Sequence, residues 1–136
     1  MNRSKSGSRQ VGALQERLAA EFLSQNGVEI VGHNFHSGRA GEIDLIGYDG
    51  SVLVFFEVKY RSASRCGAPE ESVTLDKQRQ ISKAARFYLS SNHISPDRPI
   101  RFDVVAIRPA QRGEDGCARV ALHWVRNAFS YCGPAV

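Results

Sequence analysis

The chain has 136 residues, of which 42% are hydrophobic and 24% charged, a composition typical of one folded domain. No stretch approaches the roughly 18 apolar residues of a membrane helix, and no apolar core follows the basic residues at the start, so neither a membrane protein nor a secretory signal is expected. Three cysteines without a C-x-x-C pair argue against a disulfide framework or a zinc site and favour a reducing cytoplasm: Cys66, Cys117 and Cys132.

The net charge of +4 favours a polyanionic partner. Of the 18 basic residues, 14 are arginines, whose planar guanidinium group suits phosphate oxygens. Seven of the basic residues lie between Lys59 and Arg86. A solvated basic face explains the charge equally well, so charge alone does not define a nucleic-acid-binding protein.

The first third of the chain predicts one helix and one strand. Residues 1–10 are polar and basic and are expected to form a flexible arm. The segment Gly12–Gln25 has apolar residues at helical spacing, and Gly27 follows it as expected just past a helix end. The segment Val28–Phe35 predicts a short strand.

A β-hairpin is predicted in the next segment. Asp44–Tyr48 and Val52–Tyr60 are apolar runs, and the Asp49-Gly50 pair between them is a strong turn signal.

The second half predicts a helix and two further strands. A small, polar loop over 62–71 leads to a helix over 74–90, followed by strands over 100–107 and 119–125 and a Gly-containing loop between them over 109–118. The inner positions of the helix are expected to be Leu75, Gln78, Ile81, Ala85 and Leu89.

The predicted order is helix, three strands, helix, two strands. A hairpin in a chain that also crosses over through a helix implies an α/β fold with a mixed β-sheet flanked by helices. We expect one domain over 11–131 and a short tail over 132–136.

Three charged side chains stand at the ends of the apolar hairpin strands. Glu57 and Lys59 point to the same face, since side chains alternate along a strand. A two-residue turn pairs Tyr48 with Ser51 and places Asp44 diagonally opposite Glu57 on that face. Two carboxylates suit Mg²⁺ or Mn²⁺, and Lys59 can orient a water or stabilise developing charge. The alternative is a solvated Glu57–Lys59 pair, with Asp44 merely ending a turn.

Glu42 shares the face of Asp44 and is a candidate third ligand. An ion pair with Arg61 or Arg39 is the interpretation that we favour for it.

Other polar and aromatic residues favour structural roles. Asp103 lies in the middle of a strand, and we expect it to make a structural hydrogen bond. His33 and His36 are expected on opposite faces of a strand, which argues against a histidine metal site. Trp124 and Phe129 are expected in the core.

Several segments together resemble a known family. In chain order they are GALQERLAAEFL, GHNF, GEIDLI, FFEVKYR, LDKQRQI and RFDVV, covering about residues 10–130. They are similar to the YraN-like uncharacterised family, and GEIDLI with FFEVKYR resembles the core of the PD-(D/E)XK nuclease superfamily, including archaeal Holliday junction resolvases. The usual proline before the first aspartate of the superfamily is Ile43 here, and a usual glycine before the helix glutamate is Gln15. Neither departure removes a ligand.

The resemblance implies roles for individual residues. Asp44 and Glu57 would bind metal, and Lys59 would be the catalytic lysine. Glu16 matches an acid that related resolvases bring to the metal, although an exposed helix glutamate is an equal alternative.

The resemblance also implies residues that would contact nucleic acid. These are Arg61, Lys77 and Gln78, and Lys77 can equally be solvated.

The expected function is therefore that of a Mg²⁺- or Mn²⁺-dependent endonuclease acting on DNA rather than RNA, with branched or structured DNA as the substrate of the nearest resolvases. Junction cleavage requires two sites, so the expectation extends to a homodimer. The alternatives are a non-cleaving nucleic-acid-binding module and a partner-binding module of a DNA-processing assembly.

Overall fold

The computed structural model describes residues 3–38, 41–60, 73–109, 113–116 and 120–132. The elements follow the predicted order, with two helices and five strands: α1 Arg3–Gln25, β1 Val28–His36, β2 Glu42–Asp49, β3 Val52–Tyr60, α2 Leu75–Ser91, β4 Ile100–Pro109 and β5 Val120–Phe129. Neither of the helices described is long and apolar enough to span a membrane.

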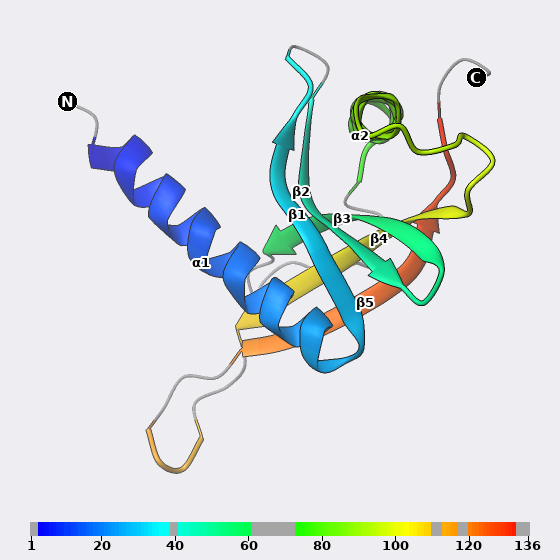
Figure 1. Ribbon diagram of the computed structural model, residues 1–136. Helices are drawn as coiled ribbons and strands as arrows, with labels where there is room; N and C mark the ends of the chain where they lie inside the picture. Colours follow the sequence, from blue (N-terminus) through cyan, green and yellow to red (C-terminus); the bar gives the residue numbers. More distant parts are fainter. Residues whose placement is uncertain (1–2, 39–40, 61–72, 110–112, 117–119, 133–136) are drawn as a thin grey trace.

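The five strands form one mixed sheet in the order β1-β2-β3-β4-β5 (Figure 1). Strands β3 and β4 are parallel and are joined through α2, whereas the other neighbouring pairs are antiparallel. The expected α/β fold with a mixed sheet flanked by helices is therefore confirmed.

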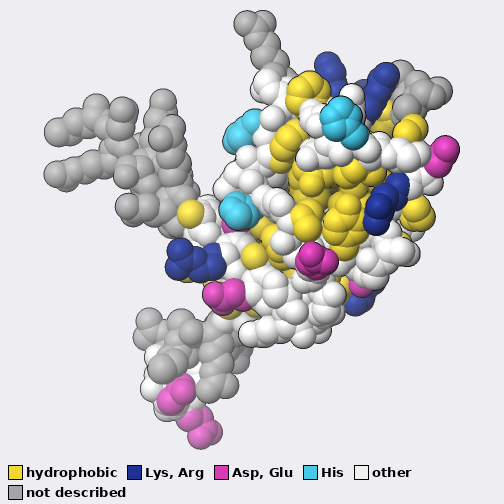
Figure 2. All heavy atoms as spheres, viewed as in Figure 1, with side chains coloured by type: hydrophobic (Ala, Val, Ile, Leu, Met, Phe, Trp, Pro, Cys, Tyr) yellow, Lys and Arg dark blue, Asp and Glu magenta, His cyan; other side chains and the backbone are white. Residues whose placement is uncertain are grey.

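The two helices cover opposite faces of this sheet. Apolar residues of α2, among them Ile81, pack on one set of strand side chains that includes Phe55 and Phe102. Residues of α1, among them Leu23, pack on the alternate set, which includes Phe56. Figure 2 shows apolar side chains gathered between α2 and the sheet, with charged side chains around their edge.

Asp103 in β4 has the structural role that its position predicts. Its side chain is fully buried and accepts hydrogen bonds from Arg101 Nε at 2.8 Å, from Trp124 Nε1 at 2.8 Å and from the backbone N–H of Asn127 at 2.8 Å. The Arg101 guanidinium also contacts Asp49 at 2.8 Å. This network ties β4 to β5 and to the end of β2.

The register of the β2–β3 hairpin differs from the prediction by two residues. Asp49 pairs with Val52, and Tyr48 pairs with Leu53 rather than with Ser51. Gly50 has φ +63° at the first of the two turn positions, as the glycine of a type II′ turn requires. The ion pair with Arg101 keeps Asp49 in the sheet, so the turn consists of Gly50 and Ser51.

Several element boundaries and one inner position also differ. Helix α1 begins at Arg3 and thus includes eight residues of the segment expected to be a flexible arm, because a polar segment gives no apolar stripe from which a helix can be predicted. Leu75, the first residue of α2, is 53% exposed, whereas Ser82 and Ala84 are buried. The last strand continues to Phe129. Several features of the prediction lie outside the described residues: the loop over 62–71 with Cys66, Arg39, Arg61, Cys117 and residues 133–136 of the tail.

Candidate metal centre

The candidate site lies where β2 and β3 separate. The two strands pair from Asp49 and Val52 as far as Leu45 and Phe56. Beyond this point β2 stays paired with β1, and β3 stays paired with β4 as far as Tyr60. In Figure 1, β1 and β2 accordingly extend upward together, while β3 and β4 extend to the left.

Asp44 and Glu57 are the first residues past the last β2–β3 pair. The backbone N–H of Val58 donates a 2.8 Å hydrogen bond to Asp44 Oδ2. This contact takes the place of the missing ladder hydrogen bonds and fixes the Asp44 carboxylate in the fork between the strands.

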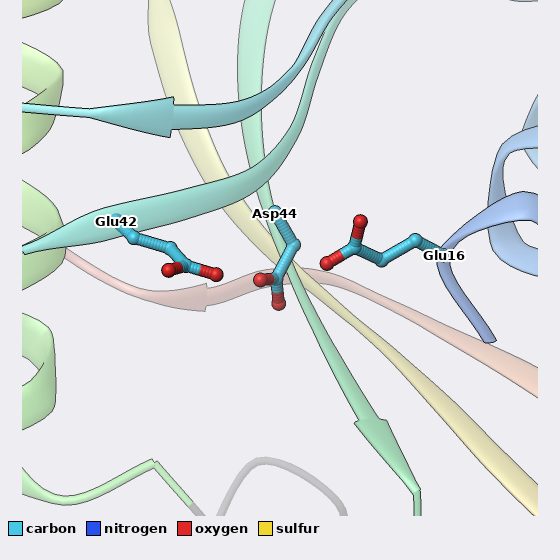
Figure 3. Close-up of side chains that lie close together, drawn as sticks. All are labelled: Glu16, Glu42 and Asp44. Atoms are coloured by element: carbon cyan, nitrogen blue, oxygen red, sulfur yellow. The ribbon is translucent and has the colours of Figure 1, made fainter. Parts of the chain in front are cut away.

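Three carboxylates converge at this fork. Oxygens of Glu16 from α1 and of Glu42 and Asp44 from β2 all lie within 4.8 Å of one another. Figure 3 shows the three side chains pointing toward a common point from the two elements. All three residues are half-buried. Carboxylate oxygens at this spacing are the hard donors that Mg²⁺ and Mn²⁺ prefer, so the residues present fit such an ion.

The pKa values of two carboxyl groups in the cluster are raised because the acids are buried and lie close together. Burial raises the pKa of the Asp44 carboxyl, and repulsion from Glu57 adds to this effect, bringing the pKa to about 8. The hydrogen bond from Val58 opposes both. Burial also raises the pKa of Glu16, against a hydrogen bond from the side chain of Asn34. The cluster therefore concentrates negative charge that only a cation or protons can neutralise.

Glu57 and Lys59 lie next to this cluster as an ion pair. Lys59 Nζ is 3.3 Å from Glu57 Oε1, and the Glu57 side chain is only 6% exposed. The solvated pair considered as an alternative is thus wrong for Glu57, although Lys59 keeps partial access to solvent. Glu57 acts electrostatically on Asp44 and Glu16 but is not one of the three residues whose oxygens converge. A direct role for Glu57 as a ligand stays a prediction.

The residues predicted to contact nucleic acid are placed only in part. Arg61 lies outside the described residues. The backbone N–H of Lys77 is bound by the side chain of Thr74, the N-cap of α2, and Gln78 Nε2 donates a 3.0 Å hydrogen bond to the carbonyl of Val73. These contacts hold the start of α2, and contact with nucleic acid stays a prediction.

Glu42 is the member of the cluster that we expected to form an ion pair with an arginine rather than to bind a metal. The arginines expected to pair with it, at positions 39 and 61, lie outside the described residues. Within the described part of the chain, Glu42 Oε2 lies 3.6 Å from His36 Nδ1. The alternation of Glu42 and Asp44 along one strand was the signal for a third ligand, and the geometry favours that interpretation.

The two histidines are not separated as expected. His36 contacts Glu42, and His33 lies close enough to Glu16 to act on its charge. Each therefore lies beside a carboxylate of the cluster. The reason is an irregularity of β1 at Asn34, whose φ of +52° interrupts the alternation of side chains.

A cavity of about 370 Å³ opens beside the cluster, between α1 and the β1–β2 hairpin. Its lining comprises Ala13, Glu16, Arg17, Ala20, His33, Asn34 and Leu45. A larger cavity of about 510 Å³ lies near the end of α2 and is bordered by Arg86, Ile94 and Tyr131, among others. No carboxylate lines the larger cavity among the residues described, so the smaller one is the access route that matters for a cation site.

The fold and the cluster define a small α/β protein with a candidate cation site at a fork in its sheet. The chain belongs to the uncharacterised protein family UPF0102, whose family model matches residues 15–107. This confirms the YraN-like family that the sequence motifs resemble.

The chain is similar to UPF0102 proteins of several bacteria. It is 48% identical over 122 residues to one from Symbiobacterium thermophilum, covering 90% of this chain and 98% of that protein. It is 43% identical over 129 residues to one from Chromohalobacter salexigens, covering 95% and 98%. A relative from Francisella tularensis subsp. tularensis is 37% identical over 120 residues, covering 88% and 94%.

Proposed function

We propose that this protein is a divalent-metal-dependent nuclease that hydrolyses phosphodiester bonds of DNA, with branched or otherwise structured DNA as substrate. The observation that carries the proposal is the convergence of Glu16, Glu42 and Asp44 at the fork between β2 and β3. The resemblance of the surrounding motifs to the PD-(D/E)XK superfamily and to archaeal Holliday junction resolvases supports it.

The cluster would hold Mg²⁺ or Mn²⁺ through its three carboxylates. A bound ion of this kind polarises a phosphoryl oxygen and lowers the pKa of a coordinated water. The Val58 hydrogen bond keeps Asp44 in place for this task, and the nearby charge of Glu57 strengthens the attraction for a cation.

Lys59 is the residue of the chain that would act on the reacting phosphate. Its ammonium group is held 3.3 Å from Glu57 and its side chain is 25% exposed, so it is both oriented and accessible. In this position it would stabilise negative charge that develops on a phosphate oxygen. Glu57 would then have two effects, raising the negative potential at the cluster and fixing the position of Lys59.

DNA would be bound through three residues that follow β3 in the sequence. The net charge of +4 and the arginine-rich composition support a polyanionic substrate. Arg61, Lys77 and Gln78 are the proposed phosphate contacts, and a homodimer would supply the two sites that cleavage of a junction requires.

Cleavage assays test the proposal directly. The protein is incubated with linear, nicked, flapped and four-way DNA and with RNA of the same sequence, in Mg²⁺, in Mn²⁺ and in EDTA. We expect cleavage of structured DNA that requires the metal, and a loss of about a hundredfold in Lys59→Ala, the scale of one positioned electrostatic or acid–base group. Lys83→Ala, which removes an exposed lysine from α2, is the matched control and should cleave normally.

Each outcome has a defined meaning. Equal cleavage by wild type and Lys59→Ala would remove Lys59 from the mechanism. DNA binding without cleavage in any metal would replace the nuclease by a non-cleaving module, and preferential cleavage of RNA would change the substrate class.

A further inference from the structure

Asn34 adopts an unusual backbone conformation for a residue inside a strand. Its φ is +52°, in the left-handed region that asparagine tolerates better than most residues with a side chain. His33 pairs with Leu45 and Phe35 pairs with Ile43 on either side of it, so the register places Asn34 level with Asp44. The left-handed residue of β1 therefore lies at the level of the acid cluster, whereas the register shift of this strand lies between Ile30 and Gly32.

The left-handed residue changes where the side chains of β1 point. In regular extended backbone, His33 and Phe35 would share a face and Asn34 would take the other. Instead, His33 and Asn34 both line the cavity beside α1, whereas Phe35 packs edge-on against Tyr88 of α2. The left-handed conformation thus brings the Asn34 side chain to the face of the sheet that is covered by α1, where Glu16 lies.

Strand β2 has a matching irregularity at the same level. Ile43 and Ile46 pack on the α2 side of the sheet, while Leu45 packs on the α1 side. Asp44, between Ile43 and Leu45, also lies on the α1 side, next to Glu16. The side chains of both strands therefore depart from alternation at the same level, and Asn34 and Asp44 both face α1.

The Asn34 side chain uses this position to hold Glu16. It makes a hydrogen bond to the Glu16 carboxylate, in which the amide N–H₂ is the donor. Glu16 is the one member of the cluster that comes from α1, whereas Glu42 and Asp44 are two residues apart on β2. Its carboxylate thus depends on contacts across the α1–β1 interface for its position.

We infer that Asn34 is a positioning residue, which orients the Glu16 carboxylate toward Asp44 and so completes the cation site from the α1 side. The inference rests on the proposed function, because it assigns Asn34 a role in holding a ligand of the proposed ion. It goes beyond that function by naming a neutral residue, in the strand that follows α1, that sets the affinity for the cation. Partners that orient metal ligands contribute about 10- to 100-fold to affinity.

The test uses Mn²⁺ alone as the probe, with calorimetric titration of the full chain. Asn34→Gly keeps the left-handed backbone, since glycine adopts positive φ without strain, and removes only the amide. We expect about tenfold weaker Mn²⁺ binding with an unchanged or higher melting temperature of the metal-free protein. Cleavage by this variant should fall at low Mn²⁺ and recover at high Mn²⁺, which loss of a merely structural contact would not produce.

Asn127→Gly is the matched control. Asn127 has φ +55° in β5, and its backbone N–H binds the structural Asp103 rather than the acid cluster. Its replacement by glycine preserves that backbone contact and should leave Mn²⁺ affinity unchanged.

A double-mutant cycle shows whether Asn34 acts through Glu16. In a Glu16→Ala background, Asn34→Gly should have no further effect on Mn²⁺ affinity. Equal Mn²⁺ binding by wild type and Asn34→Gly would overturn the positioning role and leave the proposed function intact. Absence of Mn²⁺ binding by the wild type, equal to Asp44→Ala, would overturn both.

Discussion

Asp44 and Val58 are joined by a 2.8 Å hydrogen bond across two strands that no longer pair with each other. The carboxylate accepts from a backbone N–H of β3, which would otherwise lack a ladder partner on this side of the strand. The same carboxylate lies within 4.8 Å of those of Glu16 and Glu42. One side chain thus both closes the fork in the sheet and forms the centre of the candidate site, so its charge affects stability as well as metal binding.

Asp44→Asn should stabilise the metal-free protein. The amide oxygen of asparagine can still accept the Val58 hydrogen bond, whereas the repulsion with Glu57 and the other acids disappears. We expect a gain of about 1 kcal/mol or more, corresponding to about 3 °C or more in Tm. Thermal denaturation in EDTA measures this gain, and added Mn²⁺ should stabilise the wild type but not the variant.

The gain in stability from Asp44→Asn should increase as pH rises. The pKa of Asp44 is about 8 in the folded protein and near the ordinary aspartate value of 3.8 in the unfolded chain. Between these values the folded state holds a proton that the unfolded chain releases, so wild-type stability falls as pH rises from about 4 to about 8. The advantage of Asp44→Asn should therefore be small near pH 4, grow toward pH 8 and then level off. A constant advantage across this range would contradict the raised pKa.

Glu57→Gln should lower the pKa of Asp44. Repulsion from Glu57 is the second contribution to that pKa after burial, and the substitution removes the charge with little change in shape. NMR titration of the Asp44 carboxyl carbon should show a midpoint at lower pH than in the wild type. Glu21→Gln, at an exposed position of α1, is the control and should leave the midpoint unchanged. An unmoved midpoint in Glu57→Gln would mean that the charge of Glu57 does not raise the pKa of Asp44.

Asp103→Ala should strongly destabilise the fold without acting on the acid cluster. The substitution leaves Trp124 Nε1 and the backbone N–H of Asn127 without their acceptor and deprives Arg101 of one of its two carboxylate partners. Removing one partner from a buried ionic network costs about 3–5 kcal/mol. Urea denaturation measures the loss, and Asp97→Ala, at an exposed position, should change stability by less than about 0.5 kcal/mol. Similar curves for the two variants would show that the network contributes little.

The sequence predicted the layers of the fold and part of the site, for identifiable reasons. The register error at the hairpin turn was two residues, an even number, which by itself moves no side chain of the hairpin to the other face. The prediction that Asp44 and Glu57 lie near each other was therefore correct, although the two residues lie level with each other rather than on a diagonal. Glu16 entered the prediction only through resemblance, because no local pattern shows which helix residue will meet a strand.

Asn34 could not have been predicted from the sequence. A left-handed residue inside a strand leaves no mark on hydrophobic periodicity, and the expectation that His33 and His36 lie on opposite faces failed for this reason. Local departures from regular backbone concentrate at functional sites, where the sequence pattern predicts side-chain facing least well. Here the departure lies at the level of Asp44.

Substitution by alanine at two glycines should change the stability of the protein in opposite directions. A Cβ at Gly47 in β2 would lie 2.7 Å from Val28 Cγ1 and 2.9 Å from the backbone oxygen of Glu29, which belongs to the neighbouring strand and cannot move alone. Gly47→Ala should therefore destabilise the protein by about 1–3 kcal/mol. Gly12 lies inside α1, where an added Cβ would meet no atom within 4 Å, so Gly12→Ala should stabilise by about 0.5–1 kcal/mol through helix propensity. Urea denaturation of both variants checks the pair, and a Gly47→Ala protein as stable as the wild type would show that β1 can shift away from β2 at little cost.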